Sequence, residues 1–266
     1  MLLKWRDVNP DTMDQGGRTP LSLAAEFGGN DVVKVLLEQE CVNPNTMDKG
    51  GKTPLLWAAE SEYTDVVKEL LEREGVNPNT MDKGGRTPLS WAAELGYKDV
   101  VKALLQRKDV APDTADNWGQ TPLLWAAEFG FEGVVRILLE REDVDPNTVG
   151  RNGRTPLSWA AGNGDRDVLK MILEREDVDP NTMDNNGRTP LSWAVQNGYK
   201  DVVVVKMFLE LEDVALNTAD NGGRTPLSWA AARGSQDIVK ILLEREGIVP
   251  DTADVYGGTP LSWAAG

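Results

Sequence analysis

Carboxylates at one recurring position are the first candidates for chemistry in this sequence. The series comprises Glu26, Glu60, Glu94 and Glu128, spaced 34 residues apart. Two carboxylates serve as general acid and base only where their environments separate the two pKa values, and a repeated position gives each the same surroundings. A matching basic series faces them: Arg18, Lys52, Arg86, Arg154, Arg188 and Arg224. The pattern predicts a ladder of solvated ion pairs, each worth about 0–1 kcal/mol.

A phosphate-binding loop is suggested by Gly51-Lys52-Thr53. That motif needs another glycine five residues before Gly51, and this chain has Thr46 there. Pro54 follows directly, which is typical of a threonine N-cap with proline at the first helical position. We therefore interpret the tripeptide as the start of a helix and expect no cofactor.

Tryptophan also recurs at one position of the repeated pattern. A stacking platform for bases or sugars is one interpretation, and packing in the core between helices is the other. Leu23 fills the same place in the first repeat, which favours packing. The series comprises Trp57, Trp91, Trp125, Trp159, Trp193, Trp229 and Trp263.

The sequence contains few residues that could act as catalytic nucleophiles or metal ligands. The sequence has no histidine and one cysteine, Cys41, which excludes histidine-based catalytic triads, zinc sites with histidine ligands and internal disulfides. Cys41 adjoins Glu40, and an acidic neighbour disfavours the reactive thiolate. The aspartate- and asparagine-rich turns do not complete a calcium loop. We expect no enzyme, no metal and no catalytic residue.

The charge and hydropathy of the chain limit the classes of partner it can bind. With 43 acidic and 28 basic residues, the chain carries a formal charge of −15, which repels phosphate backbones and argues against a nucleic-acid partner. No run of about 18 apolar residues and no basic, apolar leader is present, so we expect no membrane partner. The composition predicts an intracellular, cytoplasmic protein.

The elements that position these residues form a repeat. The dipeptide Thr-Pro recurs from Thr19 to Thr259 at intervals of 34 residues, with one interval of 36. We expect one array over residues 1–266, in which half-units flank seven complete units. The divisions are a half-unit 1–17, units 18–51, 52–85, 86–119, 120–153, 154–187, 188–223 and 224–257, and a half-unit 258–266.

Residues 86–119 illustrate one unit. Thr87 and Pro88 begin a short apolar helix, and Gly96 ends it by tolerating positive φ. Asp99 begins a second helix, whose apolar stripe is Val100, Val101, Leu104 and Leu105. An extended loop and a tight turn follow. Helices this short are unstable alone, so neighbouring units must stack into an α-solenoid.

These motifs resemble the ankyrin repeat. Thr-Pro-Leu-Ser-Trp-Ala-Ala, a glycine, Val-Val-Lys-x-Leu-Leu and a final Asp-x-x-Gly turn occur in order through nearly the whole chain. The tract Glu-Arg-Glu-Asp-Val-Asp-Pro-Asn-Thr is similar to the 34-residue variety abundant in fungal multidomain proteins. The resemblance implies an all-α solenoid of helix–turn–helix units whose β-turns, the fingertips, form a concave face with the first helices. In that family this face usually binds another protein.

The chain departs from the family pattern at several places. Serine, or leucine at Leu56 and Leu124, replaces the histidine whose hydrogen bonds bridge neighbouring units. Glu62 replaces a helix-ending glycine, and Gly150 replaces a fingertip aspartate. The 36-residue unit contains two additional valines at 202–205, which we expect to be absorbed as a bulge near the start of its second helix.

The favoured function is a non-catalytic scaffold that binds a partner protein on the concave face. The alternative is a recognition or regulatory segment of a larger multidomain enzyme or nucleotide-dependent receptor. A uniform spacer is disfavoured because the fingertips differ from one unit to the next. Leu2, Leu3 and Trp5, together with Leu261 and Trp263, lack stacking partners in the sequence. We therefore expect a monomer or weak end-to-end self-association.

The candidate contact site centres on Trp118, the fingertip tryptophan, near the apolar residues Leu95 and Phe129. Aromatic and arginine side chains amid polar residues are typical of interface hot spots. The competing interpretation is that Trp118 leans on a neighbouring fingertip and Phe129 packs beneath it. The complete candidate set is Lys83, Arg86, Glu94, Leu95, Asn117, Trp118, Gln120, Glu128, Phe129, Arg151 and Arg154.

Overall fold

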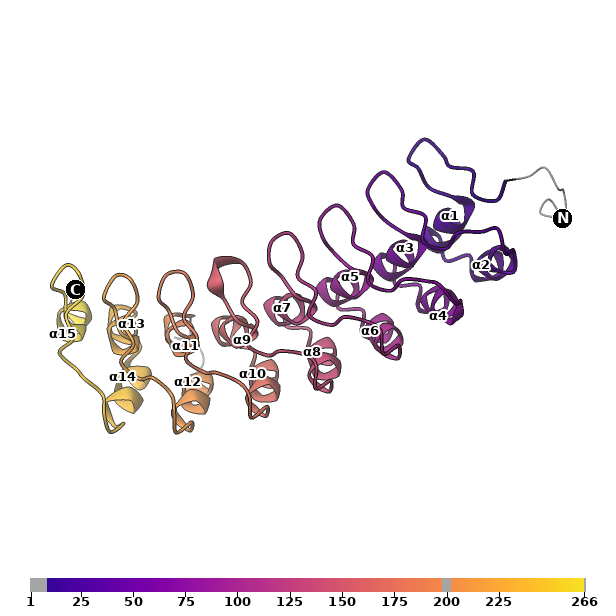
Figure 1. Cartoon of the computed structure of the whole chain (residues 1–266). Helices are drawn as coiled ribbons and strands as arrows, with labels where there is room; N and C mark the ends of the chain where they lie inside the picture. The colour runs from indigo at the N-terminus through magenta and orange to yellow at the C-terminus, as the bar shows by residue number, and fades with distance from the viewer. Residues whose placement is uncertain (1–8, 198–201, 266) are drawn as a thin grey trace. The chain divides into compact units, whose positions relative to one another are not determined.

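Paired helices form the whole of the regular structure. The computed structural model describes residues 9–197 and 202–265, and within these ranges it contains fifteen α-helices and no strand (Figure 1). The chain forms two compact bodies, Met1–Ala126 and Ala127–Gly266, called the N-terminal and C-terminal bodies below. The expected all-α repeat solenoid is confirmed, whereas the single-array division of the sequence stays a prediction.

The N-terminal body stacks its helices in two rows. The first helices α1 (Pro20–Glu26), α3 (Pro54–Glu60) and α5 (Pro88–Glu94) pack side by side, and so do the second helices α2 (Asn30–Leu37), α4 (Thr64–Glu72) and α6 (Lys98–Leu105). Each first helix also packs on its own second helix. The fingertips rise from the row of first helices (Figure 1). Helix α7 (Pro122–Glu128) runs into the next body.

The C-terminal body repeats this arrangement. Its first helices are α9 (Pro156–Asn163), α11 (Pro190–Asn197), α13 (Pro226–Ala232) and α15 (Pro260–Ala264). Its second helices are α8 (Glu132–Leu139), α10 (Arg166–Leu173), α12 (Val202–Leu209) and α14 (Gln236–Leu243). A short 3-10 helix, η2 (Arg151–Gly153), occupies one fingertip.

The sequence signals at the helix ends act as expected. In α5 the Thr87 hydroxyl accepts from the Ser90 backbone N–H at 3.1 Å, with Pro88 in the first turn. Gly96 has a φ of 76°, and Asp99 lies in the first turn of α6. Val100, Val101 and Leu104 are completely buried. Each short helix is thus held by its cap and by the neighbours that cover its apolar stripe.

Glu62 holds a backbone conformation that favours glycine. Its φ is 63°, close to the 72° of Gly28 and the 76° of Gly96 at the same repeat position. A left-handed conformation costs a residue with a Cβ roughly 1–2 kcal/mol. The fold therefore imposes its turn geometry on this residue.

Asparagine side chains, rather than the histidines of the family pattern, bridge successive repeats. The Nδ2 of Asn79 donates to the Asp109 carbonyl at 2.6 Å, and its Oδ1 accepts from the Ala111 N–H at 2.8 Å. The same double bridge is made by Asn45, Asn147, Asn181 and Asn217. Serine stays within its own unit, where the Ser90 and Thr87 hydroxyls are 3.0 Å apart.

The two additional residues of the long unit lie before its second helix. Helix α12 has eight residues, as α10 and α14 have, and two more residues separate it from its first helix than in the preceding unit. The expected bulge would fall at 198–201, which lie outside the described residues, so it stays a prediction.

Candidate functional site

The repeated tryptophans stack against cations. The Lys52 ammonium lies 4.2 Å from the centre of the Trp57 ring and 4.9 Å from that of Trp91. The Arg154 guanidinium lies 3.6 Å and 4.0 Å from the ring centres of Trp159 and Trp193. The same sandwich recurs at Arg86, Arg188 and Arg224.

This stacking corrects the expectation of plain core packing. Trp125 is buried, but the other six rings of the series are half-buried. Their faces meet lysine or arginine, which is worth about 0.5–2 kcal/mol for each contact, depending on desolvation. The rings therefore form a cation–tryptophan ladder along the first helices of each body.

A fingertip aspartate fixes the edge of each ring. Asp82, in unit 52–85, accepts from the backbone N–H groups of Gly84 and Arg86, at 2.8 and 2.9 Å, and from the Trp91 indole of the next unit at 3.0 Å. Five other aspartates make the same three contacts, namely Asp48, Asp116, Asp184, Asp220 and Asp254. Although burial raises the pKa of Asp254, the N–H donors of Gly258, Tyr256 and Trp263 leave it lower than usual.

The expected ion-pair ladder is present in the N-terminal body. Nitrogen–oxygen distances are 2.7 Å for Arg18–Glu26, 2.5 Å for Lys52–Glu60 and 2.8 Å for Arg86–Glu94. These pairs are partly exposed, so each contributes little to stability. Their repetition holds the cations in place above the tryptophan rings.

Seven residues of the candidate contact site belong to the N-terminal body. The Trp118 ring is 51% exposed, and its centre lies 5.0 Å from the Arg86 guanidinium. Arg86 in turn pairs with Glu94, which adjoins the exposed Leu95. The Asn117 amide donates to the carbonyl of the exposed Lys83 at 2.9 Å. Gln120 is completely buried and lies behind this surface.

Trp118 leans on the preceding fingertip, as one interpretation expected. A Cβ added to Gly84 would lie 3.6 Å from the ring. Half of the ring nevertheless remains exposed. The two interpretations of Trp118 are therefore compatible, because the contact with one fingertip leaves about half of the residue's surface exposed.

The remaining four candidates belong to the C-terminal body. Arg151 donates to Glu128 at 2.5 Å. Phe129 is exposed, and its ring centre lies 6.0 Å from that of Phe131. Arg154 is only 8% exposed, and burial lowers its pKa to about 10 despite the attraction of Asp184 and Glu128. Arg154 thus lies within the ladder and not on its surface.

Exposed methionines are a feature that the sequence interpretation missed. Met13, Met47 and Met81 each precede a fingertip aspartate and expose about half of their surface. Their spacing of 34 residues is a signal that the sequence contains. Together with Trp118 they give the N-terminal fingertips a repeated apolar component, and methionine adapts well to varied partners.

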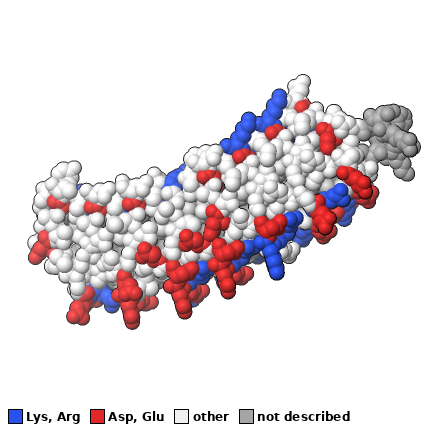
Figure 2. Space-filling model, in the orientation of Figure 1, with Lys and Arg blue, Asp and Glu red and all other residues white. Residues whose placement is uncertain are grey.

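Charge is distributed unevenly over the molecule. Basic side chains lie along the fingertip edge of the N-terminal body, where Lys49 and Lys83 are exposed (Figure 2). Acidic side chains line the opposite edge, formed by the second helices and the loops that follow them (Figure 2). The N-terminal fingertips therefore combine positive charge with apolar groups, although the whole chain is acidic.

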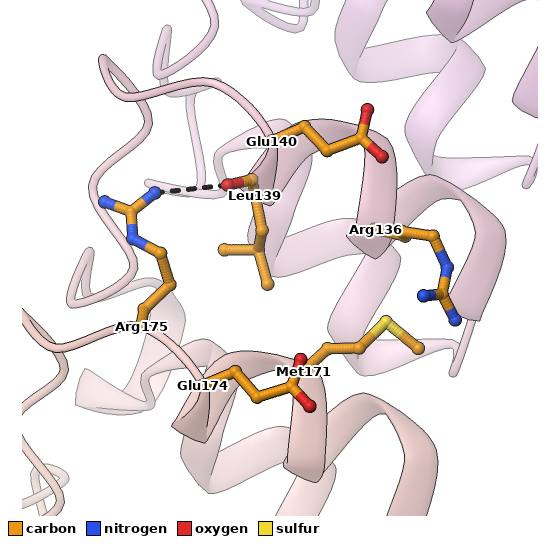
Figure 3. Close-up of a pocket in the computed structure, with 6 residues that line it drawn as sticks. All are labelled: Arg136, Leu139, Glu140, Met171, Glu174 and Arg175. Atoms are coloured by element: carbon orange, nitrogen blue, oxygen red, sulfur yellow. Dashed lines mark hydrogen bonds between the residues drawn. The ribbon is translucent and has the colours of Figure 1, made fainter.

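A pocket lies on the second helices of the C-terminal body. It has a volume of about 280 Å³ and lies between α8 and α10, and Figure 3 shows Met171 and the charged Arg136, Glu140, Glu174 and Arg175 around it. Arg175 donates to the Leu139 carbonyl at 3.3 Å. The six lining residues include no hydroxyl or thiol nucleophile. In the described ranges, no three acidic or cysteine side chains gather as a metal site.

Among residues 9–197 and 202–265, no helix has both the length and the apolar character that a bilayer crossing requires.

Comparison with known proteins identifies the repeats. A family model described as ankyrin repeats, in three copies, matches residues 1–82, 66–149, 142–205 and 203–266. No curated protein matches the sequence.

Proposed function

The chain belongs to the ankyrin-repeat family, and from that premise we propose that it is a non-catalytic scaffold that binds a partner protein through its fingertips and first helices. Ankyrin repeats are in general protein-interaction modules. The observation that carries the proposal is the half-exposed Trp118 ring, seated on Arg86 and surrounded by polar side chains. Tryptophan and arginine in such a setting dominate the energy of many interfaces.

The proposed contact residues form one surface on each of the two bodies. In the N-terminal body it comprises Lys83, Arg86, Glu94, Leu95, Asn117 and Trp118, with Gln120 supporting them from within. In the C-terminal body Phe129, Glu128 and Arg151 are the accessible members, and Arg154 supports them from the ladder. We add Met13, Met47 and Met81 to the N-terminal surface.

The chemistry of this surface defines the partner. Lysines at the fingertips favour acidic side chains, and the methionines and Trp118 favour apolar ones. We propose a partner segment that presents apolar residues flanked by aspartate or glutamate. Binding should therefore weaken as salt screens the lysines.

The proposal includes an intracellular, cytoplasmic protein that is a monomer or associates weakly end to end. The single cysteine, Cys41, is exposed and unpaired, which fits a reducing compartment. Leu261 on α15 is 79% exposed, whereas its counterpart Leu227 on α13 is 3% exposed. That apolar face is the one through which copies would associate.

The test removes Trp118 and uses another fingertip as the control. Affinity capture from the native lysate first supplies the partner, and its dissociation constant is then measured. Trp118→Ala should weaken binding by about 30-fold, equivalent to about 2 kcal/mol. Tyr256→Ala removes an exposed aromatic at the same fingertip position in the last unit and should leave affinity unchanged.

Neither substitution should alter the unfolding transition markedly, because about half of Trp118 and most of Tyr256 are exposed. A partner that binds the Trp118 variant as tightly as the unaltered protein would contradict the proposed site.

A further inference from the structure

One arginine of the C-terminal body lacks the carboxylate that the N-terminal body provides. Glu94 follows Arg86 by eight residues, and its carboxylate lies 2.8 Å from the guanidinium. The residue eight positions after Arg224 is Ala232, which is exposed at the end of α13. Among the described residues the Arg224 guanidinium makes no hydrogen bond, and its one ion pair joins Nε to Asp254 over 3.7 Å. The position of a close carboxylate beside Arg224 is therefore open.

This opening distinguishes Arg224 from the rest of the basic series. In the N-terminal body a glutamate fills the position each time. In the C-terminal body the Gln196 oxygen accepts from Arg188 at 3.1 Å. Arg154 is only 8% exposed and lies beside the buried Gly162. Arg224 keeps 25% of its side chain exposed, so a group from outside can reach it.

A hollow of about 230 Å³ lies beside this guanidinium. Its walls come from three successive fingertips, those that precede α11, α13 and α15 (Figure 1). Tyr256 borders the hollow and is 86% exposed, whereas Trp118, at the equivalent fingertip position, lies over Arg86. The lining includes Asn186, Arg188, Asn221, Arg224, Trp229 and Tyr256. Unlike the Trp118 fingertip, this one leaves room beside its arginine.

The carboxylates nearest the hollow already have donors of their own. Asp220, which also lines it, accepts from two backbone N–H groups of its own turn and from the Trp229 indole, at 2.9 to 3.0 Å. Asp254 accepts likewise from three N–H groups. Neither carboxylate lies within hydrogen-bond distance of the Arg224 guanidinium. The donors of Arg224 are therefore available to a ligand.

The N-terminal body shows which group suits this position. Carboxylates lie 2.7 and 2.8 Å from Arg18 and Arg86, the length of a charge-assisted hydrogen bond. A ligand with a single negative charge matches Arg224, because Asp254 already lies 3.7 Å from it. A doubly charged phosphate would be repelled by that carboxylate. The position therefore favours a carboxylate.

We propose that the C-terminal body binds an acidic peptide segment, one aspartate or glutamate of which enters the hollow and accepts hydrogen bonds from Arg224. A small free anion is disfavoured, because sites for small ligands bury most of the ligand, whereas Ala232 and Tyr256 leave this hollow open to solvent. A carboxylate attached to a peptide gains further contacts with the fingertips around it. The carboxylate, and not the Tyr256 ring, anchors the segment.

The inference goes beyond the proposed scaffold site and does not rest on it. It concerns a second peptide, bound by the C-terminal body alone, and Trp118 has no part in it. Trp118→Ala should therefore bind this peptide as the unaltered protein does, and either proposal can fail while the other stands.

The test follows the two indoles that flank the arginine. The Arg224 guanidinium lies 4.8 and 4.3 Å from the ring centres of Trp229 and Trp263. The full chain, labelled with 15N-tryptophan, is titrated at constant ionic strength with a capped pentapeptide of glycines around a central glutamate. Single tryptophan-to-phenylalanine variants assign the signals. Both indole signals should shift with a saturable dependence on the peptide, and the same peptide with a central glutamine should shift neither.

The N-terminal body supplies an internal control. Trp91 and Trp125 flank Arg86 in the same way, but there Glu94 is in place. Their signals should not respond to the peptide.

Three variants separate the carboxylate position from general charge effects. Ala232→Glu supplies the missing carboxylate within the chain and should weaken peptide binding at least about tenfold. Arg233→Gln makes the net charge more negative by the same amount from the adjacent exposed position and should change the dissociation constant less than about twofold. Arg224→Gln should abolish the shifts, and Gln120 already places glutamine at this repeat position.

Any of three results would overturn the proposal: no saturable shift at Trp229 and Trp263, an equal shift with the glutamine peptide, or unchanged affinity in Ala232→Glu. Two further arms test the source of the charge. Acetate that binds as tightly as the peptide would assign the hollow to a free anion. Inorganic phosphate that binds more tightly than the peptide would assign it to a phosphate group, and either result would overturn the peptide assignment.

Discussion

A residue in an unfavourable conformation shows how far the repeat frame overrides local preference. Glu62 follows α3 with a φ of 63°, while five sibling units place glycine there with φ between 65° and 78°. The repeat frame fixes this geometry, because the backbone of Thr64 bonds to Glu62 as Lys98 does to Gly96. The strain therefore belongs to the residue and can be removed without changing the turn.

Glu62→Gly should stabilise the protein. Relief of the left-handed strain gains roughly 1–2 kcal/mol, and the added freedom of glycine in the unfolded chain takes back about 0.4–1 kcal/mol. The expected net gain is about 0.5–1 kcal/mol in the free energy of unfolding, measured with urea. Glu62→Ala keeps the Cβ and should gain nothing, so an equal gain in both variants would mean that the charge and not the backbone is responsible.

At the scale of the element, the sequence predicts what lies within a repeat better than what joins repeats. The caps of α5 were predictable because Thr87, Pro88 and Gly96 act on their own backbone. The asparagine bridges were not predictable, because Asn79 binds backbone groups of residues 30 and 32 positions away. A backbone group is the same at every residue type, so the sequence does not indicate which one is bound.

In the candidate site, too, features set within one repeat were predictable and features set by neighbouring repeats were not. Exposure of Trp118 followed from its place at the tip of a turn. The burial of Gln120 and Arg154 depends on the packing of neighbouring units, and the sequence of one unit does not contain it. Repetition could have indicated the methionine series, since Met13, Met47 and Met81 share one position.

Asn79→Ala should weaken the contact between two successive repeats. It removes one hydrogen bond to the Asp109 carbonyl and one from the Ala111 N–H, for an expected loss of about 1–2 kcal/mol. Asn79→Asp keeps the acceptor and loses the donor, an arrangement that Asp11 already shows with the Asn43 N–H at 3.0 Å. Its loss should be about half as large. Equal losses in the two variants, measured by urea unfolding, would show that the acceptor half of the bridge contributes nothing.

At the scale of the whole molecule, the titratable groups divide the pH range into two regimes. The chain has no histidine, so few groups change charge between about pH 5.5 and 8. Below this range the aspartates titrate. Hydrogen bonds from the arginine two residues earlier lower the pKa values of Asp109, Asp143 and Asp177, and the Arg18 backbone N–H lowers that of Asp14.

The pH dependence of stability follows from these shifts. A carboxyl group whose pKa is lower in the folded chain stabilises it above the unfolded value of about 3.9, and this stabilisation is lost as pH falls through the folded value. The unfolding temperature should therefore be nearly constant from about pH 5.5 to 8 and fall below about pH 4. Acidification also reduces the net negative charge of −15 and so relieves repulsion between acidic groups. This effect raises the unfolding temperature, so a decline in that temperature cannot come from repulsion between acidic groups. Thermal unfolding followed by circular dichroism across this range tests the argument, and a marked loss of stability between pH 7 and 5.5 would contradict it.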